Sequence, residues 1–406
     1  MSSSVAQNIL FVDGEASSQV SELARFVGAQ TGDGTAEFAF ADGSAAAVVQ
    51  GCLGGVLASA GEEKLEAVYN QLFAVVALDG PAETAGARLA LHTDAIVGDL
   101  ALHCTSAAAA LHVLNNLYNV LASVAGGAAT GAARARVFEA IVAVAARGGQ
   151  LGSLVPLVGR VAALAGEWGV GAARQTQVLM GLRQALDAAG LANEAYAVEL
   201  AVLQLGADAP EAAQVAGAAI VRFANLAAVC DVDALASAVA GVQGVDAAAT
   251  GLLETLVSGD YAQWTAFAAA QGPALARLGV DAERAGDKMR LLTVAALAAA
   301  NLGQPVSLAR VAAAIGVAEE DVEMWVIDVI RAGLMQGKMN QVARSLLPTR
   351  STYRVFGAEQ WAQLRVRLAA WHQSLGDLQP VISNAKLVAQ QQAQQMAGQA
   401  RVTIKE

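Results

Sequence analysis

The chain has 406 residues, of which 55% are hydrophobic and 15% are charged, so it can bury the cores of two or three domains. Its net charge of −11 and its pI near 4.9 argue against a general binder of nucleic acid or of anionic membranes. The charge is uneven, because residues 331–406 contain ten Lys and Arg against three Asp and Glu. An acidic body therefore ends in a basic segment.

Cysteine usage and the first residues of the chain indicate the compartment. Cys52, Cys104 and Cys230 lie far apart and form no C-x-x-C pair, which predicts neither a disulfide framework nor a zinc ribbon. No basic residue precedes Arg25, so the charged start of a secretory signal is missing. We therefore expect a cytoplasmic protein.

The longest uncharged stretch, residues 100–133, exceeds the length of a membrane span. Ala and Gly dominate it, and it contains His103, His112 and three asparagines, which would lose their hydration in lipid. This composition favours buried helices of a solenoid over a transmembrane segment.

The N-terminal part of the chain is weakly patterned at first. Residues 1–60 are rich in Ala, Gly and Ser, and residues 28–46 predict a loop between two short helices. From Leu65 to Val76 apolar residues recur at helical spacing, and "DGP" at 79–81 predicts the end of this helix.

Further amphipathic helices follow with short connections, for example at 176–190 and 193–210. Successive helices joined in this way are typical of antiparallel pairs that stack side by side. No repeat of fixed length is visible, so the pattern alone predicts a helical-repeat solenoid.

A winged helix is predicted beyond this solenoid. Amphipathic helices at 308–315 and 319–331 are separated by Gly316, which is the arrangement of a helix-turn-helix. The segments 334–341 and 343–349 are short and flanked by turn-prone residues, as the two strands of a wing are. The expected core face of the second helix consists of Val322, Trp325, Val326, Val329, Ile330 and Gly333.

The second helix is acidic where a DNA-reading helix would be basic or amide-rich. Its single Arg331 is outnumbered by acidic residues, which are Glu319, Glu320, Asp321, Glu323 and Asp328. These carboxylates suit the positive end of a helix and not a major groove. The pattern favours a protein-packing module, and a nucleic-acid-binding regulator that uses the basic segment 331–367 is the less favoured alternative.

The C-terminal residues contain what we call the heptad seam, whose members are separated alternately by three and four residues: Trp361, Leu364, Leu368, Trp371, Leu375, Leu378 and Ile382. Such a repeat is typical of supercoiling helices, because a straight α-helix drifts against it by about 20° per heptad. Pro380 removes a backbone donor within the seam. We therefore predict a C-terminal helix in two segments that joins a bundle with other chains, and then a Gln-rich tail.

No pattern in the sequence predicts catalysis. Residues 333–338, "GLMQGK", are one residue too short between the glycines for a phosphate loop and are followed by Met339 where that motif needs Ser or Thr. His103, Cys104 and His112 lack a fourth ligand at zinc spacing. We therefore expect no catalytic residue, metal site, cofactor or small-molecule substrate.

Several stretches resemble a known family. They are "KMRLLT" at 288–293, "DVE..VID..R" at 321–331, Lys338 with Gln341 and Arg344, and "ST.R.FG..QW..L...L.AW.Q.L" at 351–375. The last has an irregular spacing that chance would rarely reproduce. Together they resemble the PCI-domain scaffold proteins of the proteasome lid, the signalosome and eukaryotic translation initiation factor 3, and most specifically the M-subunit family of that factor.

This resemblance implies a mainly α protein: a right-handed helical-repeat solenoid, a winged-helix domain and a C-terminal helix. It implies a non-catalytic scaffold that supports assembly of initiation factor 3, binding to the small ribosomal subunit and formation of preinitiation complexes. The implied partners are other PCI- and MPN-domain subunits and the small ribosomal subunit, with non-specific contact to ribosomal RNA backbone and no membrane. A scaffold subunit of the signalosome or proteasome lid is the alternative within the same fold.

The predicted domains and interface residues follow from this comparison. The domains are a weakly patterned segment (1–60), N-terminal helical repeats (61–210), the helical part of the PCI domain (211–286), its winged-helix part (287–352) and the C-terminal helices with the tail (353–406). The residues expected at subunit interfaces are Met335, Gly337, Met339, Arg344, Arg350, Arg354, Leu375, Leu378 and Ile382.

Overall fold

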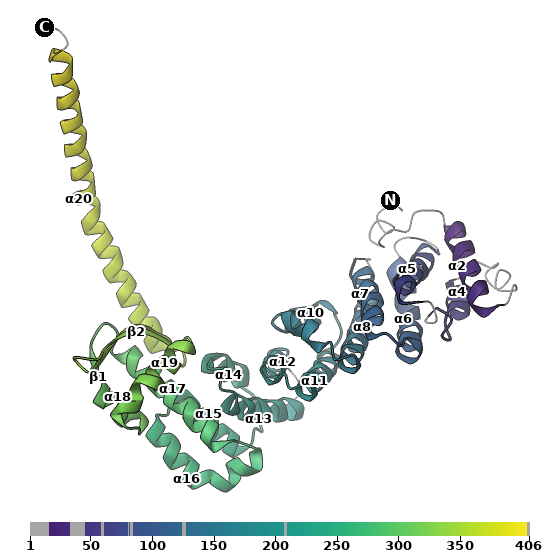
Figure 1. The fold of residues 1–406 in the computed structure, drawn as a ribbon, viewed down its shortest axis with the longest axis horizontal. Helices are drawn as coiled ribbons and strands as arrows, with labels where there is room; N and C mark the ends of the chain where they lie inside the picture. Colours follow the sequence, from purple (N-terminus) through teal and green to yellow (C-terminus); the bar gives the residue numbers. More distant parts are fainter. Residues whose placement is uncertain are drawn as a thin grey trace. The chain divides into compact units, whose positions relative to one another are not determined.

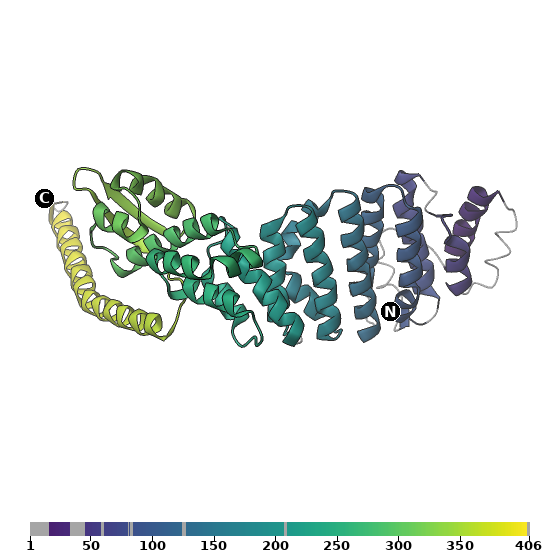
Figure 2. The ribbon, with the colours of Figure 1, turned by 90° about the horizontal axis from the view of Figure 1, so that it is seen from below.

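A computed structural model describes residues 16–32, 45–57, 61–79, 81, 84–123, 127–206 and 209–403 (Figures 1 and 2). The chain divides into two units, one ending at Ser351 and the other beginning at Thr352. The first unit contains an α solenoid and a winged-helix domain, and the second contains the C-terminal helix. The predicted fold class is confirmed in this order of elements.

The solenoid begins with helices that pack on their neighbours in sequence (Figure 2). In α5 the whole predicted stripe from Leu65 to Val76 is buried, and the helix ends just before Asp79. Of the loop predicted at 28–46, residues 28–31 and 45–46 are instead helical, because the adjacent helices extend into it, and residues 33–44 lie outside the described residues. The bounds of the first helices are α2 (Ala16–Thr31), α4 (Ala45–Cys52), α5 (Glu62–Leu78), α6 (Ala85–His103), α7 (Ala107–Ser123) and α8 (Gly127–Arg147).

The second half of the solenoid continues the same packing, in which α12 contacts both α11 and α13. The two helices predicted at 176–190 and 193–210 are confirmed as α11 and α12. The elements here are η2 (Leu151–Leu154), α9 (Val155–Val158), α10 (Val161–Glu167), α11 (Ala172–Ala188), α12 (Ala192–Gln204), α13 (Ala209–Asn225), α14 (Val232–Val239), α15 (Ala247–Ser258) and α16 (Tyr261–Leu278).

The winged helix has its predicted helix-turn-helix, in which Gly316 ends the first helix in the left-handed conformation that glycine tolerates best. The antiparallel sheet has the order β1-β3-β2. Two residues of the expected core face were predicted wrongly. Ile330 is 39% exposed, because the buried stripe of its helix is narrower than the run of apolar residues, and Gly333 is exposed because it follows the end of that helix. The elements are α17 (Ala282–Ala300), β1 (Val306–Ser307), α18 (Leu308–Ile315), η3 (Glu319–Asp321), α19 (Val322–Arg331), β2 (Met335–Asn340) and β3 (Ser345–Ser351).

The C-terminal helix differs from the prediction of two segments. α20 (Ala358–Thr403) is one continuous helix with Pro380 inside it, and it includes most of the Gln-rich tail (Figure 1). Proline removes only one backbone donor, so a helix can continue past it and accommodate the ring by bending. Figure 2 shows that α20 is curved.

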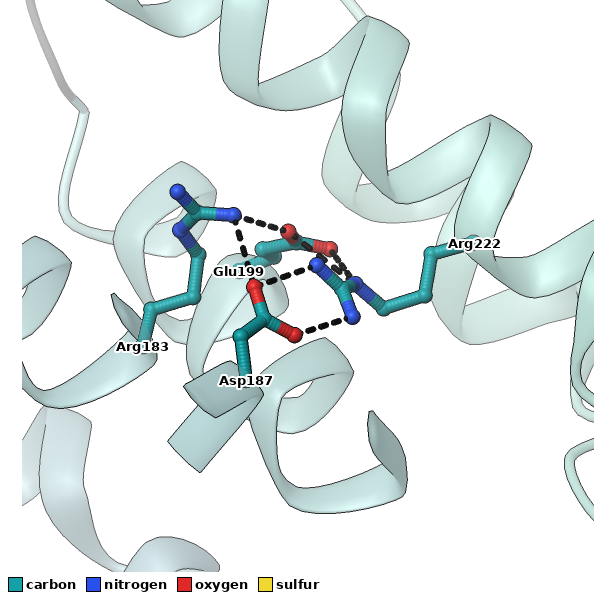
Figure 3. Close-up of polar contacts among 4 residues, drawn as sticks. All are labelled: Arg183, Asp187, Glu199 and Arg222. Carbon is teal, nitrogen blue, oxygen red and sulfur yellow. Dashed lines mark hydrogen bonds and ion pairs between the residues drawn. The ribbon is translucent and has the colours of Figure 1, made fainter. Parts of the chain in front are cut away.

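Four charged side chains connect three successive solenoid helices (Figure 3). Glu199 of α12 is fully buried and accepts hydrogen bonds from Arg222 of α13, at 3.1 Å, and Arg183 of α11, at 3.3 Å. The other edge of the Arg222 guanidinium donates to both carboxylate oxygens of Asp187 of α11. Burial raises the pKa of Glu199, and the two arginines oppose this effect. Two positive and two negative groups thus compensate one another inside the helix stack.

A buried lysine links the solenoid to the winged helix. Lys288 of α17 is 2% exposed, and its ammonium donates to the carbonyl oxygens of Phe223 and of Val229, the latter at 2.7 Å. It also lies 3.8 Å from the centre of the Phe223 ring, within the range of a cation–π contact. Burial lowers the pKa of Lys288 to about 8. The end of α13 is therefore held against the first helix of the winged-helix domain.

We predict that Arg222→Met destabilises the chain by about 3–5 kcal/mol at pH 7, because it leaves the carboxylate of Glu199 buried without its main partner. The folded-state pKa of Glu199 lies above its unfolded value, so acid favours the folded form of this group. The loss should therefore be smaller at pH 5 than at pH 7. Urea unfolding of the full chain at both pH values measures it.

The matched control is Arg136→Met, which breaks an exposed ion pair with Asp94, in which the two side chains are 43% and 82% exposed. It also removes a 3.6 Å contact with Glu139, which keeps its closer partner Arg174 at 2.7 Å. Such pairs contribute about 0–1 kcal/mol, so this variant should unfold close to wild type. Equal losses for the two variants would contradict a structural role for the buried cluster.

Candidate subunit-interaction surfaces

The outer strand of the wing is the first candidate surface. β2 pairs with β3 on one side, and among the described residues no strand covers its other side. Unpaired backbone groups on such an edge can hydrogen-bond a strand of another chain. Met339 is half-buried against the core, and Lys338 beside it is exposed.

Two of the predicted interface residues have roles inside the wing. Met335 is 1% exposed, so its side chain belongs to the core. Gly337 follows a register shift in β2, and a Cβ atom there would lie 2.9 Å from the carbonyl oxygen of Leu347. Glycine is therefore required by the hairpin itself, and these two positions offer a partner only their main chain.

The three predicted arginines lie in different surroundings. Arg344 has a φ of 47°, its guanidinium lies 3.1 Å from Glu319, and its carbonyl accepts from the N–H of Leu308 at 2.8 Å. It therefore fixes the hairpin against α18 and η3. Arg350 is exposed on β3, whereas Arg354 is half-buried at the start of the second unit.

A second surface on α19 was missed in the sequence. Met324, Ile327 and Ile330 are 61%, 36% and 39% exposed and are spaced three residues apart, so they extend around the helix from the border of the buried stripe at Ile330 to its opposite side at Met324. The signal was present, because apolar residues occur around nearly the whole helix and not on one face only. An exposed apolar face bordered by carboxylates is typical of a protein-binding surface and not of a DNA-reading helix.

The third candidate surface is the heptad seam of α20. Its seven side chains are between 37% and 68% exposed, and the predicted interface residues Leu375, Leu378 and Ile382 are 67%, 52% and 65% exposed. The helix is introduced by an aromatic cluster in which the rings of Phe356 and Trp361 meet edge to face at 4.9 Å. The side chain of Gln360 accepts from the N–H of Gly357 just before the helix.

The polar groups around His103 hold structure together. His103 Nδ1 lies 3.0 Å from Asp99, which also accepts from the N–H groups of Gly54 and Gly55 and from the hydroxyl of Tyr69. The described residues contain no cluster of His, Cys, Asp or Glu arranged to hold a metal ion. Nor does any described helix combine the length and apolarity that crossing a membrane requires.

Family models match the two parts of the chain that carry these surfaces. Residues 281–347 match the family described as "PCI domain". A PCI domain is therefore present in this part of the chain. Residues 354–382 match a second family, "eIF3 subunit M, C-terminal helix". The matched residues include the whole heptad seam from Trp361 to Ile382.

Relatives named "Eukaryotic translation initiation factor 3 subunit M" agree with these matches. The one from Aspergillus terreus is 34% identical over 290 residues, which are 68% of this chain and 62% of the relative. That from Aspergillus oryzae is 33% identical over 289 residues, 67% and 60% of the two chains. The relative from Phaeosphaeria nodorum is 45% identical over 124 residues, which are 30% of this chain and 28% of the relative. The chain thus spans about three-fifths of the length of its first two relatives.

If a partner subunit pairs with the edge of β2, Met339→Pro should weaken its association with this chain, because proline cannot continue a ladder of hydrogen bonds. The solenoid should stay folded, with an unchanged helical circular dichroism spectrum. Co-purification of the subunits measures the association.

The control is Val342→Pro, which places proline in the turn between the strands at a residue that is 98% exposed. It should associate as wild type does. If Met339→Pro also associates normally, the edge is not used.

Proposed function

We propose that this PCI-domain protein is a non-catalytic scaffold subunit of eukaryotic translation initiation factor 3 in the cytoplasm. The observation that carries the proposal is the match of residues 354–382 to the C-terminal helix of subunit M, because those residues are the exposed heptad seam. The names of the relatives favour this factor over the signalosome and the proteasome lid.

The chemistry of the surfaces suits assembly. Burying one large apolar side chain is worth about 1.5–3 kcal/mol, so seven seam residues supply more than enough free energy for association once ordering costs are subtracted. The knobs-into-holes geometry of heptads adds specificity for other helices with the same spacing. The edge of β2 would add main-chain hydrogen bonds to a neighbouring winged helix.

Two binding surfaces on one chain together bind an assembly more tightly than either surface binds alone. Once the seam is bound, the wing edge meets its partner as an intramolecular event at a high effective concentration. We propose that the partners are other PCI- and MPN-domain subunits, and that the assembled factor binds the small ribosomal subunit. Exposed arginines such as Arg350 would then face acidic protein surfaces or ribosomal RNA backbone without reading bases.

The seam is tested by the triple variant Leu375→Lys, Leu378→Lys and Ile382→Lys in the full chain. It should remain folded, because all three side chains are already more than half exposed. Its incorporation into initiation factor 3 reconstituted from recombinant subunits should fall by at least about 100-fold, since three buried apolar side chains would be replaced by charges. Incorporation is measured by size-exclusion chromatography across a concentration series.

The matched control places three lysines on the opposite side of the same helix, as Ala370→Lys, Gln373→Lys and Asn384→Lys. It has the same number of added charges but leaves the seam intact, so it should incorporate normally. Normal incorporation of the seam variant would reject the seam as an assembly element. Incorporation of wild type into a reconstituted signalosome, and not into initiation factor 3, would reject the proposed function.

A further inference from the structure

A groove on the solenoid is lined by no residue of the wing or of the C-terminal helix. It runs between α11 and α13, which both pack on α12, and its volume is about 720 Å³. An adjoining pocket of about 790 Å³ continues from it along α13 toward α15 and shares Gln214 with it. Each volume is within the range of sites that bind ligands. We call the first the α11–α13 groove and the second the adjoining pocket.

Small residues line both hollows. Gly181 in the middle of α11 and Gly217 in the middle of α13 each cost about 1 kcal/mol relative to alanine in a helix. A Cβ atom at either position would meet no atom within 4 Å, so the packing of the fold gives no reason for glycine there. The absence of a side chain at both leaves room for a ligand's main chain to approach the helices closely.

The polar groups of the groove match the main chain of an extended polypeptide. Gln177 and Gln184 are exposed on α11, and Gln214 is exposed on α13. Gln184 and Gln214 each offer donors and an acceptor, whereas the oxygen of Gln177 already accepts from Arg174 at 2.9 Å, so Gln177 offers mainly its N–H donors. An extended chain presents N–H and C=O groups along both of its edges. The groove-facing row from Ala173 to Gln184 spans about 17 Å, the length of about five extended residues.

A buried hydroxyl in the same row is unsatisfied. Thr176 lines the groove, is 3% exposed, and its hydroxyl has no hydrogen-bond partner among the described residues. A buried polar group without a partner costs free energy, which a hydrogen bond to a bound ligand would recover.

The charged residue of the groove indicates the charge of the ligand. Glu211 is the one charged residue lining the α11–α13 groove, and the described residues give it no ion pair. In the adjoining pocket the charges are compensated internally, since Arg222 is bound to Glu199 and Asp187. The pocket also contains Leu226 and Leu278, which suit an apolar side chain.

We propose that the α11–α13 groove and the adjoining pocket bind an extended segment of another polypeptide that carries a Lys or Arg and a large apolar side chain. The glutamine amides hold its main chain, Glu211 pairs with the basic side chain, and the adjoining pocket takes the apolar one. This site is independent of the proposed assembly function, because it uses neither the wing edge nor the heptad seam.

The test uses the full chain and a phage-displayed library of random peptides of about 12 residues, longer than the roughly five that the groove spans. Selected peptides should carry a basic and an apolar residue. Their affinity, measured by fluorescence anisotropy, should fall by about tenfold or more in the variant Gly181→Leu with Gly217→Leu. Its melting temperature should not fall, because leucine is the better helix former and the added side chains have space.

Gly98→Leu is the matched control, since Gly98 also lies within a helix, has no atom within 4 Å of a built Cβ and is not in the groove. Peptide affinity should be unchanged in this variant. Methylation of the peptide's main-chain nitrogens should weaken binding to wild type by roughly tenfold, as the loss of one to two hydrogen bonds would.

Three results would overturn the proposal. Peptides could bind the Gly181→Leu, Gly217→Leu variant as tightly as wild type, or the library could enrich no peptide on wild type over that variant. Circular dichroism could also show that the bound peptide is helical, which would exclude an extended ligand. None of these results bears on incorporation into initiation factor 3.

Discussion

The fully buried carboxylate of Glu199 is the constraint on which the arrangement of the solenoid depends. A charge without access to water is stable only if opposite charges reach it, and here they come from the helices on either side. Arg222 can satisfy Glu199 and Asp187 together only at one relative position of α11, α12 and α13. Apolar helices rich in alanine could slide past one another at little cost, whereas this cluster specifies a single register.

Polar contacts also fix the position of the winged helix relative to the solenoid. Lys288 binds the carbonyl oxygens of Phe223, near the end of α13, and of Val229 in the loop that follows, so these contacts fix the position of α17 against the solenoid. Arg290, two residues later, lies over the rings of Tyr261 and Trp325 and so connects α16, α17 and α19. Directional polar contacts thus position the winged helix, while apolar packing supplies most of the stability.

A chain positioned in this way exposes surfaces that it cannot cover itself. The edge of β2, the apolar side of α19 and the heptad seam of α20 are each costly to leave in water or prone to pairing. A monomeric protein usually removes such features. Their presence in one chain is consistent with a subunit whose stable form is an assembly.

The sequence by itself determined the elements that depend on local spacing: the stripe of α5, the helix-turn-helix around Gly316, the wing and the heptad seam. It also determined that the second winged-helix helix is acidic. Only the tertiary structure decided that Glu199 pairs with Arg222, that Met335 and Gly337 serve the hairpin, and that α20 continues through Pro380. The physical reason is that residue spacing fixes which side chains share a face, whereas partners distant in the sequence fix which face is covered.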